Sequence, residues 1–225
     1  MDVPKYTTIF SKRKSMSITI NRNGDIIVKA PKKTNKHYIN EIIKSKINFI
    51  NKHRDIILKK RAAYPKKECK EGEIFYYLGD KYILHFDSNE TKIRIQNDSM
   101  ILPIKEIEII KTMIIKWYKT EAKKILFNRL NYYSSKTSIS YKSLKITSAK
   151  SRWGSCGSNG NINLNWKLII LPIKLIDAVI VHELVHIEIA NHSKKYYERV
   201  REIIPNYNEF NKELKKHSAI LEDIF

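Results

Sequence analysis

The sequence predicts an α+β fold, in which a β-rich N-terminal region with one basic helix precedes a helical region built around a small sheet. Short β-branched and aromatic runs, separated by Asn-Gly or Gly-Asp pairs, recur through the first 104 residues. From residue 105 onward the apolar residues recur mainly every three or four positions, which is typical of helices. An apolar run at 178–190 then contains the letters H-E-L-V-H. We therefore expect two domains, residues 1–104 and residues 105–225.

The N-terminal region begins with a predicted hairpin. Strands at 15–20 and 25–29 flank Asn23-Gly24, a pair that suits a two-residue turn. Pro31 stops the second strand, and isoleucines at helical spacing then predict a basic helix that ends near Arg61. Further strands are expected at 74–78, 82–86, 92–95 and 100–102.

The C-terminal region begins with a long amphipathic helix, from about Ile107 to Tyr133. A strand at 144–147 and a hairpin that turns at 157–160 and returns along 161–167 come next. The H-E-L-V-H helix follows, with Pro172 in its first turn, where a missing N–H costs nothing. Later helices are expected at 194–203 and 209–222. This order, a backing helix, a small sheet and then the His-Glu-x-x-His helix, resembles a minimal zincin-like core.

The H-E-L-V-H motif carries the clearest chemical signal. His182 and His186 stand four residues apart, so both rings lie on one helix face and can bind a single zinc ion. Glu183 stands beside the first histidine and can take a proton from water at that zinc. Burying these polar groups in an apolar helix without partners would be costly, and a metal ion compensates. We expect a zinc cofactor, with Glu183 as the catalytic general base.

His192 is the expected third metal ligand. A straight helix would carry it about 9 Å beyond His186 and turn it roughly 120° away, so the helix must end between the two. Asn191 is the expected terminator, because Asn tolerates the left-handed backbone found just past helix ends. Glu198 and Glu202 stay open as rival third ligands, since carboxylates also bind zinc.

The charge of the chain is strongly positive and uneven. The formal net charge is +20, and residues 1–70 hold 19 Lys+Arg against 5 Asp+Glu. An excess of Lys, Ile and Asn is the bias expected of an AT-rich genome, which explains part of the charge. A basic surface can still face phosphates, so nucleic-acid binding through this region remains an alternative. The sequence shows no zinc-finger or helix-turn-helix signature.

Composition also indicates the cellular compartment in which the protein is expected. The two cysteines, Cys69 and Cys156, cannot form a disulfide framework, which favours a reducing cytoplasm. The most apolar stretch, residues 168–181, is too short to span a bilayer and contains Lys174 and Asp177. We therefore expect a cytoplasmic protein that has no membrane partner.

Several motifs together resemble one family. They are S-R-W-G-S-C at 151–156, N-I-N-L-N-W at 161–166, and H-E-L-V-H-(x5)-H followed by S-K-K-Y-Y. This pattern resembles the YgjP-like metallopeptidase-domain family, a relative of the SprT-like proteases. The resemblance covers nearly the whole chain and is most specific from Ser151 to Pro205. Members usually carry Phe-Trp where this chain has Tyr196-Tyr197, a conservative change.

The resemblance implies a zinc-dependent hydrolase of the zincin type, with metal ligands at His182, His186 and His192. The function expected from the sequence is therefore a zinc metallopeptidase that acts on peptides or proteins. Its kinship with SprT-like proteins makes a DNA-associated protease, or a nucleic-acid-binding protein using the basic N-terminal region, the alternative. A structural zinc module without turnover is a further rival.

Other residues have expected roles near this site. The return strand 161–167 is the expected edge along which an extended peptide pairs its backbone. One of Tyr196, Tyr197 and Tyr207 could donate to an oxyanion, although such tyrosines more often pack in cores. Trp153 is expected to pack the sheet against the metal helix, and Arg152 to pair with a carboxylate. The sequence leaves the substrate and the oligomeric state undetermined.

Overall fold

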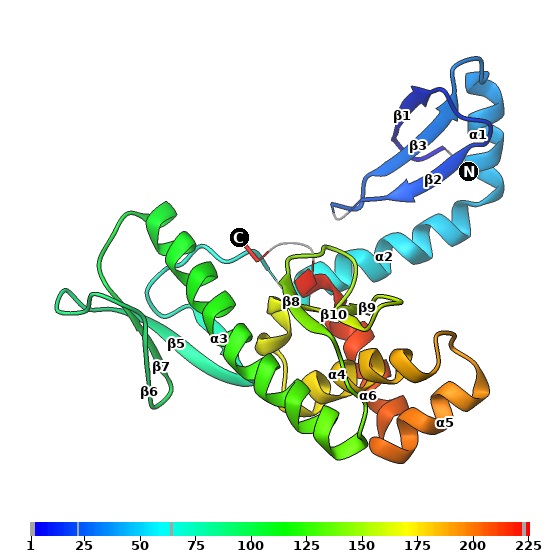
Figure 1. The fold of residues 1–225 in the computed structure, drawn as a ribbon. Helices are drawn as coiled ribbons and strands as arrows, with labels where there is room; N and C mark the ends of the chain where they lie inside the picture. The colour runs from blue at the N-terminus through cyan, green and yellow to red at the C-terminus, as the bar shows by residue number, and fades with distance from the viewer. Residues whose placement is uncertain (1–2, 22, 64, 222–223) are drawn as a thin grey trace. The chain divides into compact units, whose positions relative to one another are not determined.

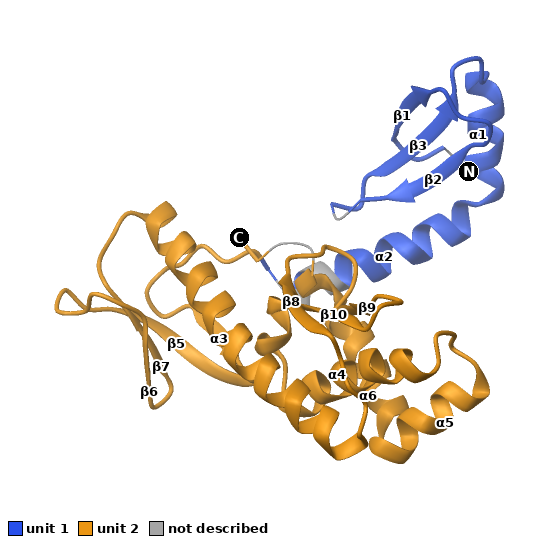
Figure 2. Cartoon of the chain, viewed as in Figure 1, with its two compact units in different colours: residues 1–65 blue, residues 66–225 orange. Residues whose placement is uncertain are grey.

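The computed structural model describes residues 3–21, 23–63, 65–221 and 224–225, and it shows the predicted mixture of helices and strands (Figure 1). The described residues form six α-helices, two short 3₁₀ helices and three small sheets. They divide into two compact units, residues 1–65 and 66–225 (Figure 2). The domain boundary predicted between residues 104 and 105 lies inside the second unit. No helix in the described ranges is long and apolar enough to cross a membrane.

The first unit is a three-stranded sheet covered by helix. Its strands are β1 (Tyr6–Ser11), β2 (Ser17–Ile20) and β3 (Ile26–Pro31), in the order β1-β3-β2. The predicted hairpin is present as the antiparallel pair β2–β3. Strand β1 is not among the predicted strands, because it is largely exposed and lacks a strong alternation of apolar residues; it pairs parallel to β3.

The basic helix of this unit is two helices, not the single one predicted. They are α1 (Lys36–Ser45) and α2 (Ile47–Ala63), and they meet at Lys46. The side chain of Asn35 caps α1 by accepting a hydrogen bond from the His37 N–H. Sheet and helices bury a small core of their own, made of Ile26, Val28, Ala30, Ile39, Ile43 and Ile50.

The second unit opens with a four-stranded sheet, which explains why residues 66–104 belong to it. The strands are β4 (Ile74–Tyr77), β5 (Asp80–Phe86), β6 (Arg94–Gln96) and β7 (Ser99–Leu102), in the order β4-β5-β7-β6. Leu78 and Gly79, between β4 and β5, both have positive φ, as a type I′ hairpin turn requires. The Leu78 N–H donates to the carbonyl of Ile169, 2.6 Å away. A Cβ added at Gly79 would lie 2.8 Å from Pro172, so this turn packs against the segment that leads into α4 (Ile173–Glu188).

The long predicted helix is α3 (Ile107–Thr137). It packs against the 3₁₀ helix η1 (Trp166–Ile170) and against α4. Its Tyr118 is buried, and the Tyr118 hydroxyl donates to the carbonyl of Tyr76, which also ties α3 to the four-stranded sheet. The buried residues recur every three or four positions along it: Ile110, Ile114, Tyr118, Ala122, Leu126, Leu130 and Tyr133.

A three-stranded sheet lies between α3 and α4 in the chain. Its strands are β8 (Ser143–Thr147), β9 (Gly154–Cys156) and β10 (Asn161–Asn165), in the order β8-β10-β9. The prediction that the return strand forms the edge of the sheet is wrong, because the return strand β10 is the central strand. It pairs antiparallel to β9 on one side and parallel to β8 on the other. The edge strand that packs on α4 is therefore β9.

The C-terminal helices are α4 (Ile173–Glu188), α5 (Lys194–Ile203) and α6 (Tyr207–Lys216), followed by the 3₁₀ helix η2 (His217–Leu221). Pro172 caps α4 at its start, one position before the first helical residue. The last predicted helix, 209–222, is thus replaced by α6 and η2, and residue 222 lies outside the described residues. A two-pronged ion pair holds α4 on α3: Arg129 donates to both oxygens of Asp177, at 2.7 and 2.5 Å.

Replacing Arg129 by methionine is expected to destabilise the second unit by about 2 kcal/mol, because it leaves the nearly buried Asp177 carboxylate without its charged donor. Denaturant unfolding followed by tryptophan fluorescence would measure this, since Trp117, Trp153 and Trp166 all lie in that unit. Arg94→Met, at an exposed pair with Glu90, is the control and should cost less than about 1 kcal/mol. Equal effects of the two variants would contradict the anchoring role.

Candidate metal centre and active site

The candidate site lies at the C-terminal end of α4. The helix ends at Glu188, and Ile189 takes an extended backbone (φ −134, ψ 99) while its N–H still bonds the carbonyl of Val185. The chain therefore turns away from the helix axis two residues before Asn191. The prediction that a left-handed Asn191 ends the helix is wrong, because Asn191 is not among the residues with positive φ.

This break brings three imidazoles together. The Nε2 atom of His192 lies 3.1 Å from Nε2 of His186 and 3.2 Å from Nε2 of His182. Two nitrogens at 2.0–2.1 Å from a tetrahedral zinc ion stand about 3.3 Å apart, so the observed spacing fits such an ion closely. The three residues form a group that can hold a metal ion, as the sequence predicts.

The rival ligands lie elsewhere. Among the described residues, the group of possible ligand atoms contains neither Glu198 nor Glu202. The Glu198 carboxylate pairs with Lys194 at 3.7 Å, and the Glu202 carboxylate accepts from Arg199 at 3.2 Å. Both are ordinary surface ion pairs on α5.

The outer nitrogens of two histidines have partners that fix their rings. Nδ1 of His182 lies 2.7 Å from the hydroxyl of Tyr207, and Nδ1 of His186 lies 3.3 Å from the carbonyl of Ile189. When Nε2 gives its lone pair to a metal, the proton is on Nδ1, which then donates to these oxygens. The same residue, Ile189, thus ends the helix and orients a candidate ligand.

Tyrosine rings complete the surroundings. The ring of Tyr196 stacks on His186, with centroids 4.5 Å apart, and its hydroxyl donates to the carbonyl of His182. Tyr197 stacks more loosely on His192, at 5.9 Å. The hydroxyls of Tyr196 and Tyr207 are engaged in holding His182, so an oxyanion role is not what their contacts indicate.

Burial favours the neutral form of the histidines. It lowers the pKa of His182 to about 3, with repulsion from His186 and His192 acting in the same direction. Burial likewise lowers the pKa of His186. Because a metal binds the neutral imidazole, the fold holds these two rings in the form that a metal requires.

Glu183 is nearly buried, with 5% of its surface exposed, and it faces the edge strand β9. A Cβ added at Gly154 would lie 2.6 Å from its Oε1, so only a glycine leaves room for this carboxylate. Burial raises the pKa of Glu183 to about 7, while the positive charge of Arg152 and a hydrogen bond from the Cys156 N–H act against the rise. Glu183 follows from the motif alone, whereas its contacts with Gly154 and the Cys156 backbone do not, because they depend on where β9 lies.

Three histidine nitrogens converge beside a buried carboxylate, and this arrangement can hold a metal ion. Residues 14–217 match the model of the YgjP-like family, described as a metallopeptidase domain, and the chain belongs to that family. It is therefore a metallopeptidase, as the resemblance implies. Family membership implies a metal ion, and the three histidines fit one.

Among solved structures, the chain is similar to the metallopeptidase zymogen of Pyrococcus abyssi abylysin. The two are 16% identical, with a TM-score of 0.39, and the match covers 45% of this chain and 100% of that one. A search of curated proteins finds no match.

Replacing Tyr207 by phenylalanine is expected to weaken zinc binding about 10-fold or more, because His182 loses the partner of its Nδ1. Competition with a chromophoric chelator would measure the affinity. The control is Tyr197→Phe, which keeps the ring that stacks on His192. Unchanged affinity in the Tyr207 variant would show that the hydroxyl does not orient the ligand.

Proposed function

We propose that this protein is a zinc-dependent peptidase of the zincin type, in which His182, His186 and His192 hold the zinc and Glu183 is the general base. The observation that carries the proposal is the convergence of three Nε2 atoms at tetrahedral-site spacing, with one buried carboxylate beside them. In a zincin-like core, α3 corresponds to the backing helix and α4, which carries the His-Glu-x-x-His motif, to the metal-binding helix.

When bound, zinc supplies a Lewis acid that polarises the scissile carbonyl and lowers the pKa of water towards about 7. The residues of the chain supply the proton transfers. Glu183 accepts a proton from the attacking water and later donates it to the leaving amine. Gly154 and the Cys156 N–H fix the carboxylate for this purpose.

The substrate backbone is proposed to lie along β9. The Asn165 N–H donates to the carbonyl of Trp153, and the Gly157 N–H donates to the carbonyl of Asn161. Because the backbone groups of an antiparallel strand alternate in direction, those of Gly154 and Cys156 point away from β10. The Cys156 N–H bonds Glu183, and the remaining outward groups can pair with an extended peptide beside the base.

Substrate trapping would test the proposal. Zinc-loaded Glu183→Gln protein keeps the metal and the β9 edge but lacks the base, so it is expected to retain uncleaved polypeptides that mass spectrometry then identifies. His186→Ala is the matched control, since it should lose the metal and retain little. Equal recovery from both proteins would contradict a zinc-dependent peptide site.

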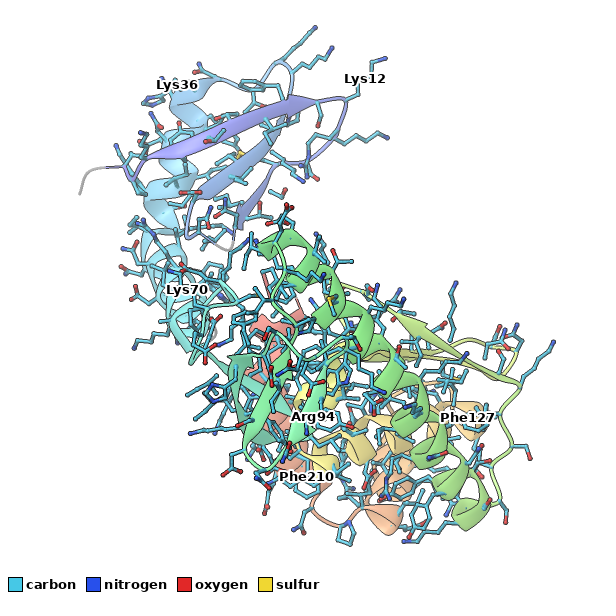
Figure 3. The ribbon with its side chains drawn as sticks, turned by 90° about the vertical axis from the view of Figure 1, so that its left-hand side faces the viewer. Lys12, Lys36, Lys70, Arg94, Phe127 and Phe210 are labelled. Atoms are coloured by element: carbon cyan, nitrogen blue, oxygen red, sulfur yellow. The ribbon has the colours of Figure 1, made fainter. Side chains whose placement is uncertain are left out.

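A DNA-associated protease is the second candidate, and one observation favours it. Residues 1–65 hold 16 Lys+Arg and 4 Asp+Glu, and the side chains of Lys12 and Lys36 are exposed on this unit (Figure 3). Binding of a labelled duplex that weakens steeply with salt would support this candidate. No binding at low salt would exclude it.

A further inference from the structure

A cavity of about 300 Å³ opens beside the candidate metal centre. His182 and Glu183 of α4 form part of its wall together with the preceding turn of the same helix, and the remaining wall comes from β9 and the segment before it, α6 and η2. Ligand pockets usually measure about 300–1,000 Å³, so this one is small. Its size suits one amino-acid residue rather than a long segment of substrate.

The inside of this cavity is mainly apolar. Val179 on α4 is one turn before Glu183, so the apolar wall adjoins the general base directly. An apolar substrate side chain that enters the cavity would exchange contact with water for contact with apolar side chains. The free energy gained in this way is the usual reason why such pockets prefer apolar residues. The apolar residues of the wall are Trp153, Ala178, Val179, Leu214 and Leu221.

Two cations contribute to the wall of the same cavity. Arg152 and Lys215 are both exposed. In the part of the chain that the structure describes, neither side chain has a carboxylate within ion-pair distance, so the expected pairing of Arg152 with a protein carboxylate is not present. Arg152 acts on Glu183 only as a nearby charge. The guanidinium fork is suited to two-pronged binding of a carboxylate from outside.

We propose that this cavity receives an apolar side chain of the substrate residue next to the scissile bond, and that Arg152, with Lys215, binds a carboxylate on that residue or its neighbour. The inference rests on the proposed peptidase function and names its substrate class. The carboxylate has two sources, the C-terminus of a peptide or an acidic side chain. The apolar residues of the wall favour an apolar substrate side chain, and the two cations favour a substrate that carries a carboxylate.

Binding to the metal-free protein tests the pocket without any need for catalysis. N-acetyl-leucine and its amide are titrated into chelator-treated protein by calorimetry, with Trp153 fluorescence as a second signal. The acid is expected to bind at least tenfold more tightly than the amide. Arg152→Gln should remove this difference, whereas Lys150→Gln, an exposed cation outside the cavity, should keep it. Equal binding of acid and amide, or no effect of Arg152→Gln, would overturn the proposal.

Hydrolysis by the zinc-loaded enzyme then identifies the source of the carboxylate. One peptide pair differs in a free or amidated C-terminus after the apolar residue, and a second pair differs in an internal Asp or Asn at the same place. A lower KM for the acid member of one pair, lost in Arg152→Gln, supports that source. A uniform fall in kcat on all four peptides would instead give Arg152 a role in the chemical step and overturn its role as an anchor.

Failure of the pocket assignment can be distinguished from failure of the proposed peptidase function. If the acid binds selectively to the metal-free protein but no peptide is cleaved, the pocket stands as a binding site and the peptidase function fails. If peptides are cleaved with no preference for an apolar residue or a carboxylate, the function stands and the pocket assignment fails.

Discussion

Glu183→Gln is expected to lower kcat for peptide hydrolysis by a factor of about 10² to 10⁴, the usual contribution of a general base. The reason is that glutamine keeps the size of the side chain but cannot accept the proton of the attacking water. It should also keep the zinc, because the three histidines remain in place. Hydrolysis of a quenched-fluorescent peptide, together with metal analysis of the same sample, measures both quantities.

The matched control is Glu198→Gln. Glu198 is half-exposed on α5, pairs with Lys194, and lies outside the group of possible metal ligands. It should leave kcat and zinc content unchanged. A Glu183 variant that loses its zinc would show that the carboxylate is a metal ligand rather than a base.

His186→Ala is expected to reduce zinc affinity by more than about 100-fold, the upper end of what loss of an outer partner costs a metal site. One of only three converging nitrogens is removed, and the ring that Tyr196 stacks on goes with it. Hydrolysis should disappear with the metal. Zinc content after dialysis, measured alongside circular dichroism, separates loss of metal from loss of fold.

His85→Ala serves as the histidine control, because His85 is a half-buried residue on β5 that bonds Glu71. It should keep stoichiometric zinc. A parallel comparison of His192→Ala with Glu202→Ala decides the third ligand, and only the first should behave like His186→Ala. Retention of full zinc by the His186 variant would contradict the proposed centre.

Sequence periodicity was enough to predict the helices and strands whose apolar residues recur at regular spacing. The 31-residue helix α3 has its buried face at the predicted spacing, and α5 has the predicted bounds of 194–203. The hairpin that leads to the metal helix was also predicted, because a glycine turn separates two short strands. The three histidines follow from spacing together with the necessity of a helix break.

The rest depended on contacts between distant parts of the chain. Which strand forms the edge depends on β8, which pairs with β10 from 18 residues before it. The helix could end at an extended Ile189 as well as at a left-handed Asn191, and sequence alone does not choose between them. The contact of Tyr207 with His182 spans 25 residues, and neither the spacing nor the type of residue signals it.

Anomalous diffraction at the zinc absorption edge, from crystals of the protein with zinc bound, tests the central claim most directly. We expect one strong peak about 2.0–2.1 Å from Nε2 of His182, His186 and His192, with a fourth position open to solvent and Glu183 outside the ligand set. The absence of a peak there, or a fourth ligand from the protein that closes the site, would contradict it.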